Sequence, residues 1–315
     1  MKTQLKTLYV MDSLEKINVK GDSTYMMMLE ANRRGWDTFF CHPSDLFVKE
    51  GVAQARMSQV LVKSEEPHFT PFSVAEHSLD EFDVVWMRKD PPFNMDYVFS
   101  TYILDLIPDT TLVLNDPRSI RNCNEKMFAL QWPELCPETL VTRDISRAMH
   151  WAKDFEKVVI KPWDGNGGRG VLVTQFGDPN FRSMLELLTQ EETEYILVQR
   201  YLPEIKQGDK RIILVDGEVV GQMARVPGIN DHRGNMHVGA SVEACALTSR
   251  DQEICAQLKP KLKALGLLFV GIDIIGDYLT EINVTSPTGI QEINALMGTK
   301  IEKILTDKIL EYYNR

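Results

Sequence analysis

Cysteine is scarce in this sequence, and long apolar segments are missing. The five cysteines are scattered, and none forms a CxxC pair. An odd number of scattered cysteines indicates reduced thiols rather than a disulfide framework. No apolar run reaches the roughly 20 residues that a membrane-spanning helix needs. The N-terminal residues lack the apolar segment and the small-residue cleavage site of a signal peptide. We therefore expect a cytoplasmic protein that does not enter a membrane.

An excess of positive charge is also missing. The chain of 315 residues holds 35 basic and 45 acidic residues, so its formal net charge is −10. This balance disfavours a nucleic-acid partner or an anionic-membrane surface, but it leaves room for a local basic pocket. The charged fraction of 25% and the apolar fraction of 43% are typical of a globular protein. At this length we expect two or three domains.

Two common catalytic patterns are absent as well. The six histidines form no HExxH motif, and no GxSxG pattern occurs. His232 and His237 stand five residues apart and are typical of plain loop residues. Zinc chemistry and acyl-enzyme chemistry therefore have little support.

The first third of the chain alternates strands and helices. We expect apolar strands over residues 7–11, 38–41, 83–87 and 111–114, and a hairpin within 43–80. Asp22, Ser23 and Thr24 offer caps for a helix that ends near Arg34 and Gly35, and another helix is expected over about 96–106. This βαβ order predicts a doubly wound parallel sheet, the α/β part of the fold.

Polar residues follow three of these strands directly. They are Asp12 with Ser13, Arg88 with Lys89 and Asp90, and Asn115 with Asp116. In open α/β sheets, ligands bind beyond the carboxyl ends of the strands. Asp12 and Asn115 are equally well explained as turn residues. In "MRKDPPF", two adjacent cations before two prolines indicate a shaped anion-binding loop.

The pattern changes after about residue 122. "SIRNCNEKMFALQW" predicts one helix, and hairpins then alternate with helices. One hairpin spans 210–226, and later helices are expected over 249–265 and 299–313. This order indicates an α+β region.

The stretch "FVGIDIIGDYLTEINVTSPTG", residues 269–289, places three polar side chains in an apolar hairpin. With a three-residue loop over 276–278, Asp273 faces Glu281, and Asn283 points to the same side. A two-residue loop would place Asp273 on the opposite face. Buried carboxylates are costly unless something pairs with them, and oxygen ligands of this kind suit Mg²⁺. We therefore expect a metal site rather than a solvent-exposed hairpin face.

"KPWDGNGGRG" puts four glycines between two expected strands, within residues 165–170. Such a loop lets backbone N–H groups approach phosphate oxygens, although it is neither GxxxxGK[ST] nor a GxGxxG that opens a helix. Lys161 ends the preceding apolar strand, so its ammonium must point toward a cleft or an anion. Lys126, near a helix start, is equally well explained as a solvated lysine.

Arg211 and Arg225 lie on the two strands of the 210–226 hairpin. Arginines of this kind stabilise phosphoryl and oxyanion charge. A strict two-residue turn at 216–217 would put them on opposite faces. Either a bulge at Gly221, or a position of Arg225 beyond the ladder, is needed for both to reach one site.

Several motifs taken together and in order resemble the ATP-grasp ligases. They are "NEK", "VIKP", the Gly-rich loop, "VQRYL", "GDKR", "GID" and "TEINVTSPTG". "MRKDPPF", "GDKRIILVDGE", "RGN" and "GIDIIGDYLTEINVTSPTG" resemble the bacterial glutathione synthetase family more closely, over essentially the whole chain. The resemblance implies the ATP-grasp fold. It divides the chain into an N-terminal substrate-binding domain (1–122), a lid subdomain with the Gly-rich loop (123–202) and a catalytic subdomain (203–315).

The resemblance also implies a reaction. ATP would phosphorylate the cysteine carboxylate of γ-glutamylcysteine, and the amine of glycine would displace the phosphate, giving glutathione and ADP. Two Mg²⁺ ions, for which Mn²⁺ can substitute, would assist, and the chain would form a homotetramer. The alternative is another ATP-grasp carboxylate–amine ligase with different amino-acid or peptide substrates. A non-catalytic ATP-binding regulatory protein has less support, because the metal ligands and both arginines are retained.

Site residues follow from the resemblance by position. The ATP site would comprise Lys126, Lys161, Gly165, Asn166, Gly167, Gly168, Gln199, Arg200, Tyr201, Leu202 and Asp209. Asp273, Glu281 and Asn283 would hold the metal ions, and Arg211 and Arg225 would be catalytic. Substrate contacts would come from Asp12, Ser13, Arg88, Arg233, Asn235, Ser286 and Thr288. The loop over 226–241 would be a lid, although its "HVGA" departs from the glycines that the family carries there.

Overall fold

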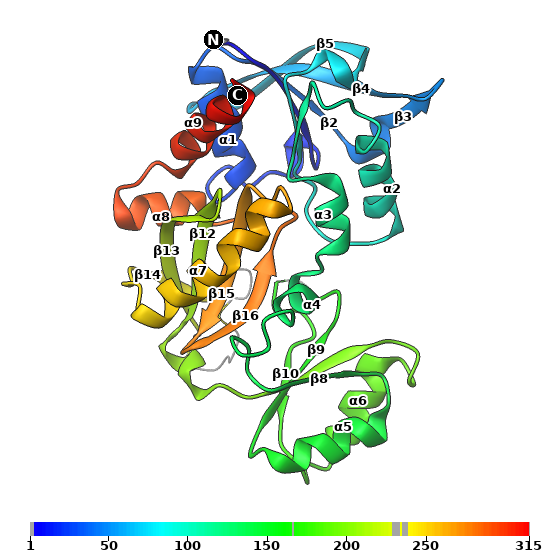
Figure 1. Cartoon of the computed structure of the whole chain (residues 1–315), viewed down its shortest axis with the longest axis vertical. Helices are drawn as coiled ribbons and strands as arrows, with labels where there is room; N and C mark the ends of the chain where they lie inside the picture. Colours follow the sequence, from blue (N-terminus) through cyan, green and yellow to red (C-terminus); the bar gives the residue numbers. More distant parts are fainter. Residues whose placement is uncertain (1–2, 166, 229–233, 235–238, 315) are drawn as a thin grey trace.

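The computed structural model describes residues 3–165, 167–228, 234 and 239–314, which fold around three β-sheets (Figure 1). The N-terminal sheet has the order β3-β4-β2-β1-β6-β7, with β5 paired to β4. Its strands are β1 (Lys6–Val10), β2 (Asp37–Cys41), β3 (Leu46–Lys49), β4 (Val52–Val62), β5 (Phe69–Ser78), β6 (Val84–Met87) and β7 (Leu112–Leu114). β1 pairs in parallel with β2 and β6, and β6 with β7, which confirms the parallel pairing predicted from the βαβ order. The sheet as a whole is mixed, because β4 pairs antiparallel with β2, β3 and β5.

The helices of this region are α1 (Ser23–Arg33), α2 (Met95–Leu104) and α3 (Pro117–Asn122). α1 begins at Asp22, whose side chain accepts a hydrogen bond from the N–H of Tyr25 over 2.6 Å. It is followed by Gly35 in the left-handed conformation, with φ of 75°. Both signals were legible in the sequence, and the helix was predicted with nearly the same bounds.

The single helix expected in "SIRNCNEKMFALQW" is wrong. Two short helices, α3 and α4 (Glu125–Ala129), are separated by Cys123 and Asn124. The Asn124 side chain accepts hydrogen bonds from the N–H groups of Lys126 and Met127, so Asn124 acts as the N-cap of a new helix. α4 packs on the C-terminal sheet at β16, which brings Lys126 beside that sheet.

The middle sheet has the order β10-β9-β11-β8 and is antiparallel. It is built from β8 (Thr139–Thr142), β9 (Val158–Pro162), β10 (Leu172–Thr174) and β11 (Ile196–Arg200). Helices α5 (Ile145–Trp151) and α6 (Phe181–Thr189) cover it and share a separate apolar core with it. This sheet and its helices form the lower part of the molecule in Figure 1.

The C-terminal sheet has the order β14-β13-β12-β15-β16. Its strands are β12 (Asp209–Val215), β13 (Glu218–Val226), β14 (Ser241–Glu243), β15 (Phe269–Ile275) and β16 (Tyr278–Asn283). Helix α7 (Ser249–Ala264) clusters with Ile212 and Leu214, whereas α8 (Ile290–Met297) and α9 (Ile301–Tyr313) cluster with Ile213 and Val215. Since neighbouring strand residues point to opposite faces, α7 covers one face, and α8 and α9 cover the other.

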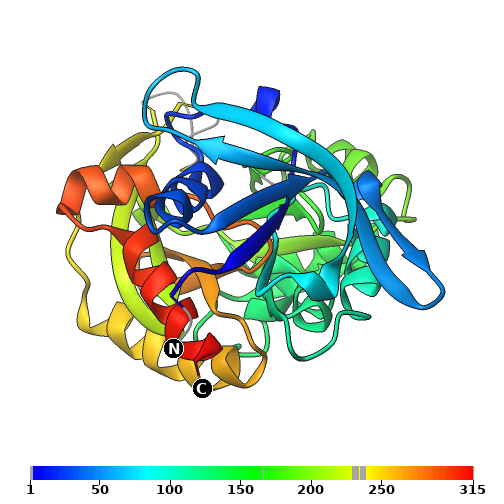
Figure 2. The ribbon, with the colours of Figure 1, turned by 90° about the horizontal axis from the view of Figure 1, so that it is seen from above.

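The C-terminal helix returns to the N-terminal region. α9 packs beside α1, as both views show (Figures 1 and 2). The sequence did not predict α8, which follows Gly289 and ends before Gly298, both with positive φ. None of the helices in the described part of the chain combines the length and the apolar content that crossing a membrane requires.

Candidate functional site

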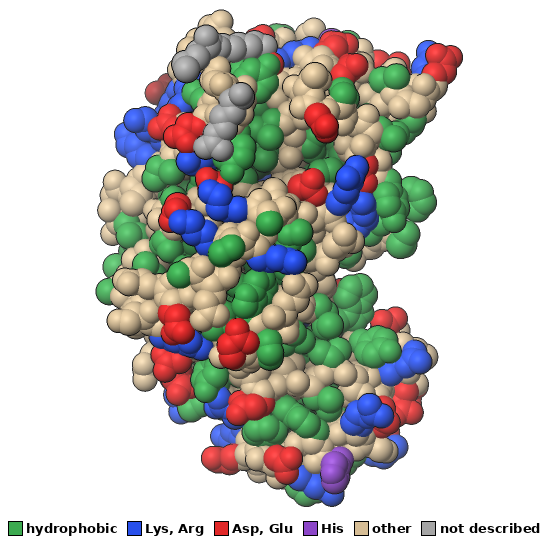
Figure 3. All heavy atoms as spheres, viewed as in Figure 1, with side chains coloured by type: hydrophobic (Ala, Val, Ile, Leu, Met, Phe, Trp, Pro, Cys, Tyr) green, Lys and Arg blue, Asp and Glu red, His purple; other side chains and the backbone are tan. Residues whose placement is uncertain are grey.

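A cavity of about 660 Å³ lies between the middle and C-terminal sheets, beside α4. The sequence-predicted residues that line it are Lys126, Lys161, Gly165, Gly167, Gly168, Gln199, Arg200, Tyr201, Leu202, Asp209, Arg211, Arg225, Asp273, Glu281, Asn283, Ser286 and Thr288. The fold therefore brings residues from distant parts of the sequence to one chamber. In Figure 3 the molecule is notched on its right side, between the part with α2 and the part with α6.

The β15–β16 hairpin places Asp273 opposite Glu281, as predicted. The predicted three-residue loop is wrong, because Ile275 pairs with Tyr278 and the turn therefore contains two residues. The register shifts between Ile274, which pairs with Leu279, and Asp273, which pairs with Glu281. Thr280 is therefore the extra residue of a β-bulge. A two-residue turn alone would have reversed the face of Asp273, and the bulge restores it.

A second bulge settles the position of the two arginines. On β12 and β13, Ile213 pairs with Gly221 while Leu214 pairs with Val219, so Val220 is the extra residue. Because of this shift, Arg211 and Arg225 point to the same face. The sequence required an irregularity at the neighbouring Gly221 for this, and the structure has one.

Asp273 is the centre of a dense ion-pair network on that face. Arg211 donates to both of its carboxylate oxygens, over 2.6 and 2.9 Å, and Arg225 Nη2 lies 3.0 Å from Oδ1. Asn283 Nδ2 donates to Oδ2 over 3.2 Å. Burial raises the pKa of Asp273, but the charges of Arg211 and Arg225 outweigh it and lower this pKa to about 2. Asp273 is therefore ionised at neutral pH.

Two further carboxylates in the cavity have a raised pKa. Burial is the main cause that raises the pKa of Asp209 to about 7, although Arg225 donates to it over 2.5 Å. Burial, followed by the charge of Glu281, likewise raises the pKa of Glu125 to about 7. Sequence reasoning missed Glu125, although the acid beside Lys126 in "NEK" was a signal. Buried carboxylates whose pKa is raised in this way favour a partner that supplies positive charge, such as a bound cation.

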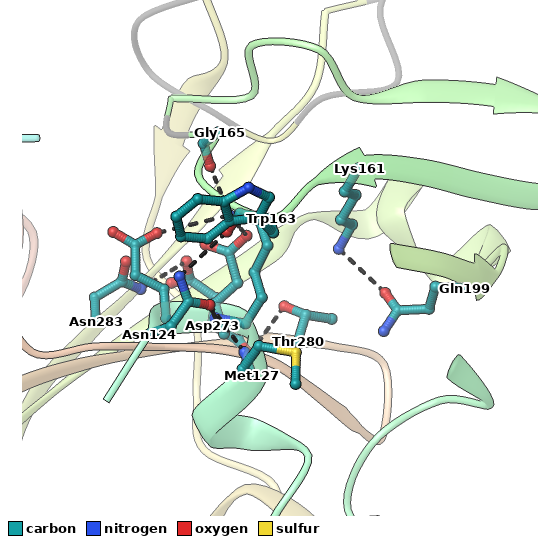
Figure 4. Close-up of polar contacts among 12 residues, drawn as sticks. Asn124, Met127, Lys161, Trp163, Gly165, Gln199, Asp273, Thr280 and Asn283 are labelled. Carbon is teal, nitrogen blue, oxygen red and sulfur yellow. Dashed lines mark hydrogen bonds and ion pairs between the residues drawn. The ribbon is translucent and has the colours of Figure 1, made fainter. Parts of the chain in front are cut away.

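The lysines lie on two sides of the cavity. Lys126, 3% exposed, donates to the carbonyl oxygen of Gly165 over 2.5 Å and lies 3.5 Å from Glu281 Oε1. Lys161 donates to Gln199 Oε1 over 3.1 Å, and burial lowers its pKa. Figure 4 shows Lys161 and Gln199 pointing toward each other. Lys126 is therefore buried in the cavity wall, and its alternative reading as a solvated helical lysine is wrong.

The Gly-rich loop comes close to the rest of the chain at Gly165. A Cβ atom there would lie 2.4 Å from Pro162 Cγ, so a larger residue does not fit without movement. Gly167 and Gly168 have positive φ, which favours glycine. The predicted Asn166 lies outside the described residues, as do Arg233 and Asn235.

Three predicted substrate residues do not line this cavity. Asp12, Ser13 and Arg88 are not among the described residues that line it. Arg88 is buried and donates to Thr24 Oγ1 over 3.1 Å and to the Pro287 carbonyl over 3.0 Å. Asp12 accepts from Lys89 over 3.1 Å. Arg88 thus contacts the segment that carries Ser286 and Thr288 rather than the cavity itself.

Sequence reasoning also missed the apolar part of the lining. These residues are Val159, Val171, Val173, Ile205 and Ile275. Flat apolar walls of this kind suit an aromatic ring, but from sequence they were indistinguishable from ordinary core residues. Within the described residues, no group of three or more His, Cys, Asp or Glu side chains is placed to hold a metal ion. The predicted metal set comprises two carboxylates and one amide.

Two family models match the chain. The model described as the prokaryotic glutathione synthetase N-terminal domain matches residues 5–121, and its ATP-grasp domain matches residues 125–298. Together they cover most of the chain.

Curated relatives match over nearly their full length. The glutathione synthetase of Brucella melitensis is 45% identical over 306 residues, covering 97% of this chain and 98% of the relative. The glutathione synthetase of Escherichia coli O6:H1 is 43% identical over 308 residues, covering 97% of this chain and 98% of the relative.

Solved structures share the fold at low sequence identity. D-cycloserine synthetase DcsG has a TM-score of 0.64 at 13% identity, over 96% of this chain and 99% of that chain. D-alanyl-alanine synthetase A from Vibrio cholerae has a TM-score of 0.62 at 14% identity, over 100% of both chains. At such identities the likeness shows the fold alone.

Proposed function

Because the chain belongs to the prokaryotic glutathione synthetase family and has its ATP-grasp fold, we propose that it joins γ-glutamylcysteine to glycine, giving glutathione, ADP and phosphate. It is an ADP-forming ligase. The observation that carries the proposal is the shared cavity, which two lysines, four arginines and five carboxylates line between two sheets. Such a chamber suits a nucleotide triphosphate and a second anionic substrate.

The reaction would proceed in two transfers. A carboxylate oxygen of the cysteine moiety bonds to the γ-phosphorus of ATP while the bond to the β-phosphate oxygen breaks, releasing ADP. The amine nitrogen of glycine then bonds to the acyl carbon, phosphate leaves, and the amine loses a proton. Arg211 and Arg225 would stabilise the charge on the transferred phosphoryl group and on the tetrahedral intermediate. Because an acyl phosphate hydrolyses readily, the enclosed chamber would also exclude water.

We assign the nucleotide to the middle-sheet side of the cavity. Lys126, Lys161 and Gly165 to Gly168 would contact the phosphates, residues 199–202 the base, and Asp209 the ribose. The apolar walls at Val159 and Val173 support a flat base at that side.

The family uses ATP and a divalent metal ion. The burial that raises the pKa of Glu125 and Asp209 fits such an ion, because a nearby cation would stabilise both carboxylates. Asp273, Glu281 and Asn283 would hold it, as two Mg²⁺ ions or Mn²⁺ in their place. When bound, the metal would neutralise charge on the phosphoryl oxygens. In its absence, Arg211 and Arg225 compensate Asp273, and Lys126 compensates Glu281.

Further parts of the proposal follow the family. Asp12, Ser13 and Arg88 with the 286–288 segment would place the dipeptide, and the loop over 226–241 would close over it. The segments 1–122, 123–202 and 203–315 would act as substrate, lid and catalytic units. We also propose a cytoplasmic homotetramer, which light scattering of the purified protein tests. The five free cysteines support a reducing compartment.

The deciding experiment supplies Mg-ATP, γ-glutamylcysteine and glycine, and measures ADP and tripeptide together. Tripeptide formed in equal amount with ADP supports the proposal. ADP released only with other amino-acid or peptide pairs would instead indicate a different ATP-grasp ligase, and ATP binding without turnover a regulatory protein. A Glu281→Ala variant, expected to fold but not to turn over, is the matched negative control.

A further inference from the structure

The segment of residues 284–289, which links β16 to α8, forms part of the cavity wall. Thr285, Ser286, Pro287 and Thr288 line the cavity. The segment has no strand or helix of its own, so other side chains must hold its backbone. The contacts are Asn115 to the Val284 carbonyl, Arg88 to the Pro287 carbonyl, Arg211 to the Thr288 carbonyl, and Ser23 to the N–H groups of Gly289 and Ile290.

Asn115 is the residue that holds the backbone at two separate positions. It follows β7 and is 4% exposed. Its Oδ1 accepts from the Phe269 N–H over 2.9 Å, and its Nδ2 donates to the carbonyl oxygens of Phe269 and Val284, each over 2.8 Å. Phe269 opens β15 and Val284 follows β16, so one side chain ties both ends of the hairpin that carries Asp273.

The chemistry of these bonds selects asparagine. The side-chain amide exchanges both backbone hydrogen bonds with Phe269, as a closely paired residue of a neighbouring antiparallel strand would. It also supplies a second donor to Val284. Only an amide offers two donors and an acceptor in this small space; aspartate lacks the donors, and glutamine is one carbon longer.

We propose that Asn115 is a positioning residue for the ligase reaction, an inference that rests on the proposed function. From the N-terminal sheet, it sets the place of β15 and of segment 284–288 relative to each other. The residues that it positions for the dipeptide are Ser286 and Thr288, two and four residues after Val284. Asp273, four residues after Phe269, is held independently by Arg211 and Arg225. It touches neither Lys161 nor Gln199, which lie on the middle sheet and are assigned to the nucleotide. Asn115 therefore affects the dipeptide end of the site and spares nucleotide binding.

The test compares Asn115→Asp, Asn115→Ala and the control Asn294→Ala with the unchanged protein. Asn294 also makes three hydrogen bonds, to Glu302, Thr299 and Ile301. It stands on α8, where its side chain faces α9, and it does not line the cavity. Steady-state kinetics are measured for γ-glutamylcysteine and for ATP separately, with thermal unfolding alongside. We expect kcat/KM for the dipeptide to fall at least about tenfold in both Asn115 variants, while KM for ATP changes less than about twofold.

The control separates positioning from general stability. Asn294→Ala is expected to lower Tm comparably and to leave both kinetic constants near those of the unchanged protein. Equal losses for dipeptide and ATP, or losses no larger than those of Asn294→Ala, would overturn the inference. Asn115→Ser, which keeps one donor, replaces any variant that does not fold and should show the same split. If the unchanged protein forms no tripeptide, the proposed function itself fails; normal tripeptide synthesis without the kinetic split rejects only the role of Asn115.

Discussion

Arg211 donates two parallel hydrogen bonds to Asp273, from Nε to Oδ1 over 2.6 Å and from Nη2 to Oδ2 over 2.9 Å. The two residues stand directly opposite each other on β12 and β15, so the backbone ladder fixes the pair. Both side chains are buried. A planar guanidinium matches a carboxylate in this way, and an ammonium does not.

Arg211→Lys is therefore expected to lower kcat by about 10²–10³-fold, as loss of a donor to developing charge does in other enzymes. The lysine keeps the charge but cannot make both bonds to Asp273, so the position of the carboxylate changes. Steady-state kinetics with saturating ATP measure the effect. Arg250→Lys is the control, because Arg250 donates to the carbonyl oxygens of Asp277 and Glu134 outside the cavity. Retention of more than about a third of kcat would show that the paired geometry is unimportant.

Glu125→Gln tests the cost of burying the Glu125 carboxylate beside Glu281. Burial and the charge of Glu281 raise the pKa of Glu125 from 4.5 to about 7 in the folded chain. The folded state then binds more protons than the unfolded state between these values, so the free energy of unfolding falls as pH rises through this window. We expect the variant to remove this decline and to be more stable at pH 8, by an amount on the order of 1 kcal/mol.

Urea unfolding of the metal-free and nucleotide-free protein at several pH values measures this difference. Glu156→Gln, at an exposed glutamate, is the matched control and should leave the pH dependence unchanged. A Glu125→Gln protein that is less stable than the unchanged protein at pH 8 contradicts the raised pKa assigned to Glu125.

Asp216→Asn tests an ion-pair network far from the cavity. Asp216 lies at the β12–β13 turn and accepts from Tyr312 over 2.6 Å and from Lys263 over 3.0 Å. Burial raises its pKa, but these two hydrogen bonds and the lysine charges outweigh it, so the net pKa lies below its ordinary value. Its stabilising contribution is therefore present above the ordinary aspartate pKa and is lost as pH falls through the lowered value.

The variant should lose about 1–3 kcal/mol of unfolding free energy at pH 7, the range for hydrogen bonds to charged groups. Asparagine tolerates the positive φ of 53° at this position, so backbone strain does not contribute. Urea unfolding of the variant and of the unchanged protein, at pH 7 and at pH 3, measures the difference in unfolding free energy. The difference from the unchanged protein should shrink at pH 3, and a difference that persists unchanged would show that charge is not its cause.

Local signals in the sequence were sufficient for much of the fold. The cap at Asp22, Gly35 after α1 and the alternation around Asp273 and Glu281 predicted elements and a facing pair that the structure contains. These features depend on neighbouring residues only. Asn124 was also a local signal, but it was read as part of a continuous helix because capping residues also occur within helical patterns.

The remaining features depend on contacts between distant segments. The bulge residues Thr280 and Val220 decide which side chains share a face, and nothing in their identity marks them. Arg88 was predicted to contact substrate, and its guanidinium also donates to the carbonyl oxygen of Pro287, almost 200 residues later, a partner that only the folded chain reveals. Asn115 was undecided between a turn and a ligand residue for the same reason.

Gly271→Ala tests how closely the backbone must approach Arg211. A Cβ atom on Gly271 would lie 3.2 Å from Arg211 Nη1 and 3.2 Å from Pro287 Cβ, both closer than ordinary van der Waals contact. Gly271 has no positive φ, so alanine suits the strand and the effect is one of space alone. We expect kcat to fall at least about tenfold, because a small displacement of a charged group at a reacting centre is costly.

Circular dichroism and steady-state kinetics measure fold and activity of this variant together. Gly21→Ala provides the control, since a Cβ there comes close only to the flexible end of Glu292, at 3.2 Å, its φ also lies outside the left-handed region, and it does not line the cavity. The control should keep the activity of the unchanged protein. Because the added methyl displaces Arg211 rather than removing it, Gly271→Ala combined with Arg211→Lys should be little worse than Arg211→Lys alone. Fully additive losses in the double variant would show that the glycine acts through another neighbour, such as Pro287.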